Sequence, residues 1–257
     1  MTWDKILWQL LDVANKYFLV VTPVFILFYV LLKKRISYKK IQLKFPKIKD
    51  YKREIAFSTL SIVIFSIPPL LLLGNDTLRP LTTFYEDSND YGILYLFLAF
   101  PLMIIMHDTY FYWMHRLMHS PWLFKQFHLI HHKSTNPTPW AAYAFHPLEA
   151  VLESLIFVIF LFTIPIHPIL LTSFFIFSII YNVYGHLGFE LYPKGFNKHW
   201  LGKWMNTSIA HNQHHQFFKG NYGLYFTIWD RLMGTLRPDY DLAYDELKKR
   251  EKIDSLQ

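Results

Sequence analysis

The chain has 257 residues, of which 53% are hydrophobic, 19% are aromatic and only 18% are charged. This composition excludes an ordinary soluble domain and predicts a membrane protein. Because the chain has no cysteine, disulfides, cysteine-held iron–sulfur clusters and thiolate-ligated haem are excluded. The net charge of +7 could indicate nucleic-acid binding. The basic residues concentrate beside apolar runs, however, so we expect anionic lipid head groups and no nucleic acid as partner.

The N-terminal third alternates between apolar and charged stretches. Residues 2–15 place apolar side chains at helical spacing and predict a helix at the membrane interface. Residues 17–32 form an uncharged first span without the basic region or cleavage site of a signal peptide. Residues 33–54 carry ten Lys/Arg against two acids, which predicts a cytoplasmic segment. Residues 55–73 form a second span that kinks or ends near Pro68–Pro69.

Three further apolar stretches follow an acidic loop. Residues 74–90 contain one Arg and four acids and fit the opposite side of the membrane. A helix over 91–119 would be roughly 43 Å long against an apolar slab of about 30 Å, so it projects beyond the hydrocarbon on the basic side. Residues 148–166 and 169–185 read as a hairpin with a proline-containing turn. With this topology, 23 of the 26 Lys/Arg lie on one side.

These stretches predict an all-α integral membrane protein with about four to five transmembrane helices and a cytoplasmic helical cap. We interpret residues 1–257 as one domain. It comprises N-terminal membrane helices with a basic loop (1–90), a catalytic region (91–237) and a polar, solvated tail (238–257). The charge asymmetry places the cap on the cytoplasmic face, in a bacterial inner membrane or an endoplasmic reticulum.

Histidines gather in three boxes near the ends of the predicted spans. His115 and His119 form an HxxxH pair. The motif HxxHH occurs twice, as His128, His131, His132 and as His211, His214, His215. On a helix, this spacing puts the three imidazoles of a box on one face. With 13 His in 257 residues, one chance HxxHH is expected about 0.03 times, so the boxes indicate a metal site.

The number and type of these side chains narrow the choice of metal. Neutral imidazole suits Zn, Cu, Fe or Ni, and eight or nine imidazoles exceed what one ion needs, so two ions are predicted. Carboxylates are scarce near the boxes, which disfavours Ca or Mg. Zinc hydrolysis would need only three ligands and an open position. An all-histidine dinuclear site beside lipid instead suits iron that activates O2 against an unactivated C–H bond.

The segments that carry the boxes resemble the fatty acid hydroxylase/sterol desaturase superfamily. The likeness includes His-Asp-Thr-Tyr-Phe-Tyr-Trp-Met-His-Arg-Leu-Met-His, Phe-Lys-Gln-Phe-His-Leu-Ile-His-His-Lys-Ser and Ala-Phe-His-Pro-Leu-Glu. It extends to His-Asn-Gln-His-His, Asn-Tyr-Gly and Trp-Asp-Arg-Leu-Met-Gly-Thr, from about Asp108 to Thr235. The resemblance implies an integral membrane, non-haem di-iron oxidoreductase of lipid metabolism that hydroxylates or desaturates a fatty acyl chain or sterol.

The resemblance also implies the metal ligands. The box ligands of the family fall on His115, His119, His128, His131, His132, His211, His214 and His215, and a further ligand most resembles His186. Some members place a second extra His nearby, where this chain offers Asn182 and Glu190 as polar candidates.

Two carboxylates are further site candidates. Asp108 shares a helical stripe with His115 and His119, so we expect it to accept a hydrogen bond from a ligand imidazole. Glu149 lies at the start of the fourth span, where a carboxylate is costly without a purpose, although a helix-start role remains open. Glu153, one turn further, has a similar but weaker case. With Asn182, Asp108 and Glu149 make up the expected catalytic set. We expect His107 to pack or cap rather than bind metal.

The cofactors and partners follow from this assignment. We expect two iron ions, which zinc could replace in purified protein, O2 as co-substrate and a membrane lipid as substrate. The sequence has no G-x-G-x-x-G segment, so electrons must come from a separate donor, such as a cytochrome b5-like protein or a ferredoxin with its reductase. Hydroxylation and desaturation share the same boxes, and hydroxylation is our expectation.

Two other functions remain open on the sequence alone. A membrane metal transporter or sensor would use the histidine clusters for metal binding, but its histidines are expected within the spans, along a pathway. A catalytically silent scaffold would be expected to have broken boxes, whereas all three boxes are intact.

Overall fold

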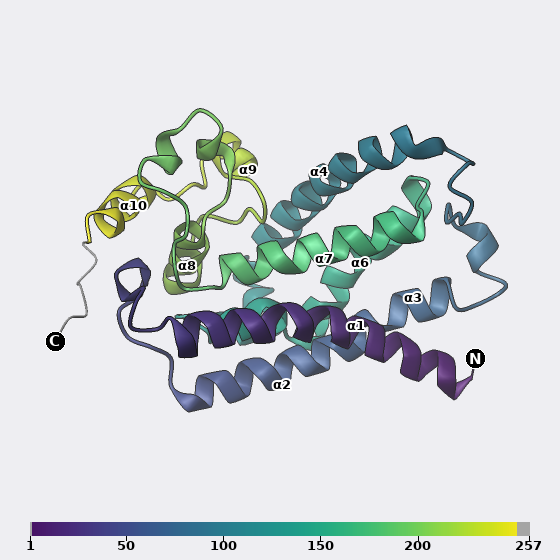
Figure 1. The fold of residues 1–257 in the computed structure, drawn as a ribbon, viewed down its shortest axis with the longest axis horizontal. Coiled ribbons are helices and arrows are strands. Elements are labelled where there is room, and N and C mark those ends of the chain that lie inside the picture. Colours follow the sequence, from purple (N-terminus) through teal and green to yellow (C-terminus); the bar gives the residue numbers. More distant parts are fainter. Residues whose placement is uncertain (1, 251–257) are drawn as a thin grey trace.

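The computed structural model describes residues 2–250, and its regular structure is helical (Figure 1). Over these residues the only β-type pairing is three isolated bridges. The helices of the first and central parts of the chain are α1 (Trp3–Phe25), α2 (Ile48–Phe65) with its short continuation α3 (Ile67–Leu72), α4 (Gly92–Met118), α6 (Pro147–Thr163) and α7 (Pro168–Gly185). Shorter helices are α5 (Leu129–His132), α8 (Ser208–Phe217), α9 (Ile228–Leu232) and α10 (Tyr240–Lys248). The all-α prediction is confirmed.

Several helical stretches are long enough to cross a membrane. Within residues 2–250, four are both long and apolar enough, namely Trp3–Leu31, Ile48–Leu72, Gly92–Met118 and Pro168–Gly185. Helix α6, with 17 residues, pairs with α7 as the predicted hairpin. The chain is therefore a multi-pass membrane protein, as the composition predicted.

The first span differs from the prediction. Helix α1 runs without a break from Trp3 and continues through a π-helical turn, Ile26–Leu31, so no separate interfacial helix exists over residues 2–15. Near the expected boundary, Asp12 and Lys16 form an i,i+4 ion pair on one helix face. Because they neutralise each other, the helix passes through this region without interruption.

The second span has the predicted break. Helix α2 ends at Phe65 and α3 begins at Ile67, just before Pro68–Pro69. Pro has no N–H to donate, so the helical ladder cannot continue regularly through this pair. The start of α2 lies inside the predicted basic loop, where the Asp50 carboxylate accepts from the backbone N–H of Lys47 at 3.0 Å.

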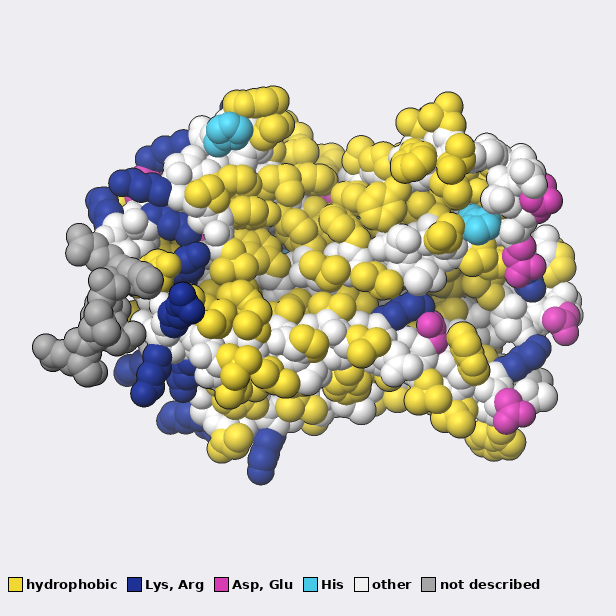
Figure 2. Space-filling model, viewed as in Figure 1, with side chains coloured by type: hydrophobic (Ala, Val, Ile, Leu, Met, Phe, Trp, Pro, Cys, Tyr) yellow, Lys and Arg dark blue, Asp and Glu magenta, His cyan; other side chains and the backbone are white. Residues whose placement is uncertain are grey.

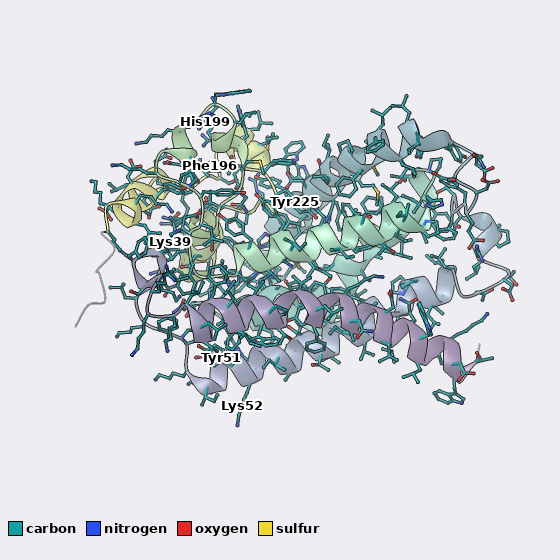
Figure 3. The ribbon with its side chains drawn as sticks, viewed as in Figure 1. Lys39, Tyr51, Lys52, Phe196, His199 and Tyr225 are labelled. Atoms are coloured by element: carbon teal, nitrogen blue, oxygen red, sulfur yellow. The ribbon has the colours of Figure 1, made fainter. Side chains whose placement is uncertain are left out.

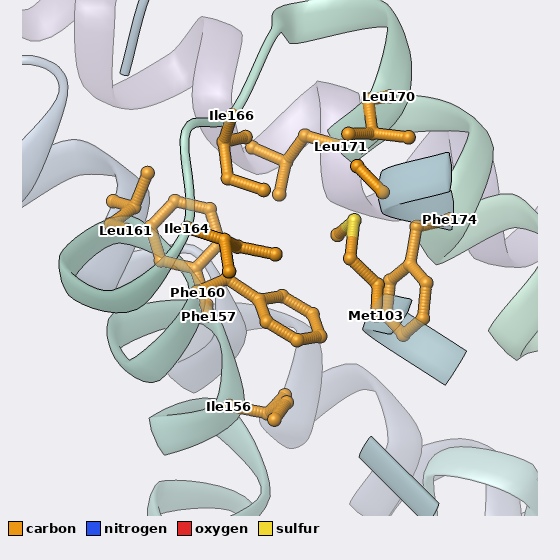
Figure 4. Close-up of a cluster of buried hydrophobic side chains, with 11 residues drawn as sticks. Met103, Ile156, Phe157, Phe160, Leu161, Ile164, Ile166, Leu170, Leu171 and Phe174 are labelled. Carbon is orange, nitrogen blue, oxygen red and sulfur yellow. The ribbon is translucent and has the colours of Figure 1, made fainter. Parts of the chain in front are cut away.

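The main apolar core lies between α4, α6 and α7 (Figure 4). Met103 of α4, Phe160 of α6 and Phe174 of α7 are fully buried there. The rings of Phe160 and Phe174 meet edge to face, with centroids 5.0 Å apart and an interplanar angle of 90°. This contact joins the two helices of the hairpin, and Phe174 also meets Phe100 of α4, the helix that carries the first histidine box, with centroids 6.4 Å apart.

Charge is distributed unevenly along the molecule. Lys and Arg side chains gather at the end formed by α8, α10 and the loop after α1, and acids gather at the opposite end, with an apolar band between them (Figure 2). At the acidic end, Thr83 ties the loop after α3 to the α6–α7 turn, since its N–H donates to Leu161 O at 2.8 Å. The backbone N–H of Tyr85 likewise donates to Ile166 O at 3.1 Å.

The C-terminal segment is not the solvated tail that the sequence predicted. Helix α10 buries Tyr240, Tyr244 and Leu247 against Ile209 and Ala210 of α8. The apolar positions of α10 recur every three to four residues and form a stripe, which covers the helix carrying the third histidine box. Residues 251–257, the rest of the predicted tail, lie outside the described residues.

Candidate metal centre

Nine histidines converge into two adjoining clusters at the basic end of the molecule. The larger cluster, cluster A, consists of His115, His119, His128, His132 and His214, and the smaller, cluster B, of His131, His186, His211 and His215. Within each cluster the ligand atoms lie within 4.8 Å of one another. The structure therefore brings together all nine histidines that the sequence predicted as ligands.

Cluster A joins all three boxes. The Nε2 atom of His119 lies 3.1 Å from Nε2 of His132 and 3.1 Å from Nε2 of His214. Nε2 of His115 lies 2.9 Å from Nε2 of His128. Metal ions bind imidazole nitrogen at about 2.0–2.1 Å, so two nitrogens on one ion, at an angle of roughly 90–110°, lie roughly 2.8–3.4 Å apart. The separations in cluster A match that spacing.

Cluster B has the same geometry around a different centre. Nε2 of His186 lies 3.3 Å from Nε2 of His131, 3.0 Å from Nε2 of His211 and 3.1 Å from Nε2 of His215. His186 directly follows α7, so the hairpin delivers the ligand that none of the three boxes contains.

Each HxxHH box contributes to both clusters. His128 and His132 belong to cluster A and His131 to cluster B, whereas His211 and His215 belong to cluster B and His214 to cluster A. On a helix with 3.6 residues per turn, positions i and i+4 point about 40° apart, while i+3 deviates from i by about 60° in the other direction. The histidines of one box can therefore supply ligands to two neighbouring ions. The sequence pattern alone did not reveal this division.

The outer ring nitrogens of several ligands are held by acceptors. Nδ1 of His115 lies 2.9 Å from the backbone oxygen of Tyr222, and Nδ1 of His214 lies 2.8 Å from that of Gly220. Nδ1 of His186 lies 2.8 Å from Asn182 O. A carbonyl oxygen can only accept, so each Nδ1 carries the proton and each Nε2 presents its lone pair to the cluster. Metal-binding imidazoles are oriented in this way.

Burial keeps these imidazoles neutral. It lowers the pKa of His131, His211 and His215 well below the ordinary value, and the neighbouring histidines lower it further. The pKa of His186 falls to about 4, again chiefly through burial. Because neutral imidazole is the form that binds metal, the site is ready to bind ions at neutral pH.

Comparison with known families agrees with this geometry. Residues 100–235, more than half of the chain, match the family described as "Fatty acid hydroxylase". The chain belongs to the fatty acid hydroxylase family. The matched region includes most of α4, the α6–α7 hairpin and all nine clustered histidines, so the resemblance predicted from the boxes is confirmed.

Relatives within this family include enzymes that act on sterols. The chain is 33% identical over 187 residues to "Lathosterol oxidase" of Mus musculus, covering 72% of this chain and 60% of the relative. It is 34% identical over 206 residues to "Delta(7)-sterol 5(6)-desaturase" of Leptosphaeria maculans, covering 80% of this chain and 53% of the relative. The matches thus span little more than half of each relative. No solved structure matches the chain.

A loop between α8 and α9 supports cluster A and was not predicted as part of the site. Asp230 anchors this loop, because its carboxylate accepts from the N–H groups of Tyr222 at 2.9 Å and Gly223 at 2.8 Å. The backbone oxygens of Gly220 and Tyr222 in turn hold His214 and His115. Tyr222 and Gly223 belong to the Asn-Tyr-Gly motif noted in the family resemblance, and Asp230 belongs to the Trp-Asp-Arg motif.

Asp108 has a different partner from the one expected. Its carboxylate accepts from the backbone N–H groups of Tyr225 at 2.7 Å and Phe226 at 3.1 Å, which are the next residues of the same loop. The shared helical stripe correctly placed Asp108 near the site. Its carboxylate, however, binds backbone N–H groups of this loop and not an imidazole. Asp108 therefore pins the loop rather than a ligand ring.

Glu149 and Asn182 lie beside the clusters in distinct ways. Oε1 of Glu149 lies 2.6 Å from Nδ1 of His128, and both side chains are buried. The side-chain amide of Asn182 donates to Ala142 O at 2.7 Å, and only its backbone oxygen reaches a clustered histidine, His186. Glu190 instead accepts from Tyr184, Tyr192 and Ile209, which fixes the start of α8.

The other four histidines stay outside both clusters. Nδ1 of His107 lies 2.9 Å from Tyr225 Oη, and Figure 3 shows Tyr225 where α4 and α7 approach the C-terminal helices. His146 and His167 accept from backbone N–H groups at the starts of α6 and α7. His199 projects from the outer loops (Figure 3).

A cavity of about 410 Å³ extends from α1 toward the clusters. Its lining includes Trp8, Asp12 and Lys16 of α1 together with Phe111 and Phe145. Phe111 contacts His115 and Phe145 contacts His131, with ring centroids 5.0 Å apart in each pair. Asn182 and Leu224 line both this cavity and a smaller pocket that reaches His211. The cavity is therefore bordered by side chains that contact histidines of both clusters.

Proposed function

We propose that this protein is a membrane-bound, non-haem di-iron oxidoreductase that hydroxylates or desaturates a lipid with O2 and electrons from a separate donor. The observation that carries the proposal is the convergence of five and four imidazoles into two adjoining clusters beside an apolar cavity. Membership of the fatty acid hydroxylase family and similarity to proteins named for sterol oxidation support the same activity.

The donor set fits two iron ions. All nine donors are imidazole nitrogens, a set that suits first-row transition metals and excludes calcium or magnesium. Clusters A and B would each hold one ion, and both offer at least the four ligands that zinc would also accept, so zinc could replace iron in purified protein. When bound, the iron pair would supply the activation of O2 and the oxidation of an unactivated C–H bond.

The reaction balances with external electrons. Hydroxylation converts a C–H bond into C–OH and consumes O2, two electrons and two protons, releasing one water. Desaturation removes two hydrogens from adjacent carbons and, with the same inputs, releases two waters. The names of the relatives favour desaturation of a sterol, whereas our sequence expectation was hydroxylation.

The chain's own residues contribute orientation and exclusion of water. Glu149 and the backbone oxygens of Tyr222, Gly220 and Asn182 hold four ligand rings in fixed tautomers. The Phe111 and Phe145 rings separate the cavity from the imidazoles. They would keep bulk water from the metals while the lipid carbon approaches along the apolar wall.

The basic end of the molecule is the proposed cytoplasmic face. The Lys- and Arg-rich segments gather there (Figure 2), and α8, which carries three of the clustered histidines, lies at the same end (Figure 1), in keeping with the excess of basic residues in cytoplasmic loops. A soluble or peripheral donor, such as a cytochrome b5-like protein or a ferredoxin with its reductase, would reach the clusters from this side. A metal transporter is disfavoured because the nine histidines gather at one end rather than along the spans.

The test uses purified protein reconstituted with iron, a donor system and bilayers that contain a Δ7-sterol or an acyl lipid. Products are followed by mass spectrometry under ¹⁸O2. Hydroxylation places ¹⁸O in the lipid, whereas desaturation lowers its mass by two hydrogens without adding ¹⁸O. The His131→Ala variant serves as the inactive control. Absence of an O2-dependent product from every lipid would contradict the proposal.

A further inference from the structure

Glu153 lies in the wall of the cavity and has no use in the metal centre. It sits on α6, one helical turn after Glu149, and lines the cavity with Ser154 of the same helix. Among residues 2–250 it takes part in no hydrogen bond or ion pair, whereas Glu149 is bound to His128. A carboxyl group on a membrane helix is costly without a partner, so its partner should come from the cavity.

Several of the other polar groups of the wall have partners in the protein. His107 is bound to Tyr225, and the Asn182 amide donates to Ala142 O. The Ser154 hydroxyl donates to Val151 O within its own helix. The remaining wall is mainly apolar and aromatic. Asp12, the other carboxylate of the wall, is paired with Lys16. Glu153 is therefore the unpaired carboxyl group of the described wall that a polar group on a bound lipid would meet.

We infer that Glu153 anchors the hydroxyl group of a neutral, hydroxylated lipid in this cavity. The inference deepens the proposed function and rests on it for the reaction, although not for binding. A hydroxyl can hydrogen-bond to the carboxyl group of Glu153 without bringing a charge into the apolar band. A free fatty acid would place its carboxylate against Glu153, which disfavours that substrate class.

The spacing along α6 also bounds where the lipid is oxidised. Glu149 and Glu153 are four residues apart, which is about 6 Å along a helix axis, and Glu149 contacts His128 of cluster A. A hydroxyl held by Glu153 lies within about one or two helical turns of the clusters. The oxidised carbon therefore lies within about 5–11 Å of the hydroxyl, a separation that fits a fused ring system better than the far end of a long acyl chain.

The inference is tested by equilibrium binding to the full-length protein in lipid nanodiscs, without iron or O2. The probes are a radiolabelled Δ7-sterol with a free 3β-hydroxyl and its 3-O-methyl ether, which cannot donate. The wild type should bind the free sterol at least roughly tenfold more tightly. Glu153→Leu should lose this preference yet bind the ether as the wild type does. Glu153→Gln, which keeps an acceptor oxygen, should retain most of the preference.

Ser154→Ala is the matched control, since it alters the same wall without removing the proposed anchor, and its preference should equal that of the wild type. Equal binding of sterol and ether by the wild type would overturn the inference without any variant. A preference undiminished in Glu153→Leu, or tighter binding of the 3-amino sterol than of the 3-hydroxy sterol, would also overturn it. If the protein prefers the free sterol but oxidises no lipid, the proposed oxidoreductase activity is rejected and the role of Glu153 as an anchor stands. If it oxidises a lipid but shows no such preference, the activity stands and the anchor is rejected.

Discussion

The carboxylate of Glu149 lies 2.6 Å from Nδ1 of His128, and both side chains are buried. This contact links α6 to the second histidine box across 21 residues of sequence. An acceptor on Nδ1 fixes the tautomer and orientation of a ligand imidazole and raises its basicity. Glu149 is thus part of the proposed metal centre without being a ligand of either cluster.

Removing this carboxylate should weaken metal binding. Glu149→Ala leaves Nδ1 of His128 without its acceptor, so we expect a loss of roughly 10- to 100-fold in metal affinity or activity. Glu149→Gln keeps an acceptor oxygen and should lose less. Metal affinity is measured by competition with a chelator of known strength. Wild-type affinity in Glu149→Ala would show that the contact does not orient the ligand.

The division between clusters predicts different effects for two adjacent histidines. His131→Ala leaves cluster B with three imidazoles, whereas His132→Ala leaves cluster A with four. Because four nitrogens still complete a stable site and three leave it open, His131→Ala should lose more iron per chain. Iron content is measured by mass spectrometry after identical reconstitution, with His199→Ala as control. Equal losses, or the reverse order, would refute this division of ligands.

Asp108 should act on stability through the loop that it holds. Asp108→Ala leaves the buried N–H groups of Tyr225 and Phe226 without an acceptor, at a cost of about 1–3 kcal/mol for each. Asp108→Asn keeps an oxygen and should cost less. The midpoint of thermal unfolding in detergent, taken on metal-free protein, separates this effect from ligand loss. An unchanged midpoint for Asp108→Ala would contradict the anchoring role.

Lys40 predicts a pH dependence of stability at the basic end. It is 1% exposed, and burial lowers its pKa to about 8. The folded state disfavours the protonated form of Lys40, so the full cost to the free energy of unfolding is present below about pH 8. This cost disappears as the pH rises toward 10.5, the pKa of Lys40 in the unfolded chain. The shift corresponds to about 3 kcal/mol.

Lys40→Met should remove that dependence. The midpoint of thermal unfolding of the variant, relative to that of the wild type at the same pH, should be higher at pH 7 than at pH 9.5. The loss of the 3.3 Å hydrogen bond from Lys40 to Asn136 is a separate effect on this midpoint. Lys133→Met, a change at an exposed position, controls for general effects of charge. A difference between Lys40→Met and wild type that does not change with pH would refute the assignment.

Much of the fold follows from patterns that the sequence displays locally. The apolar runs predicted the spans, and Pro68–Pro69 predicted the break before α3. The extent of α1 could not be predicted, because Asp12 and Lys16 look like a boundary until their ion pair is known. The prediction of a solvated tail was wrong, because Tyr240, Tyr244 and Leu247 form an apolar stripe that packs against α8. The sequence alone does not show that α8 lies beside this stripe.

The sequence predicted which histidines form the metal centre, but not how they divide between the two clusters. The boxes identified the histidines, since their spacing is local, but the assignment of His131 to one cluster and His132 to the other depends on how α5 and α8 face each other. Asp108 was given the wrong partner because the loop at Tyr225 lies 117 residues away. The support that Asp230 gives to this loop has no periodic signal either, since it is made through backbone atoms.

The most direct test of the central claim is the number of iron ions that the full-length protein binds under anaerobic conditions. Titration with Fe(II), followed by removal of loose metal and elemental analysis, should give two ions per chain in the wild type. X-ray absorption at the iron edge should show a first shell dominated by nitrogen at about 2.0–2.2 Å. Binding of one ion or none per chain, or a shell dominated by carboxylate oxygen, would contradict the claim that nine histidines hold a pair of irons.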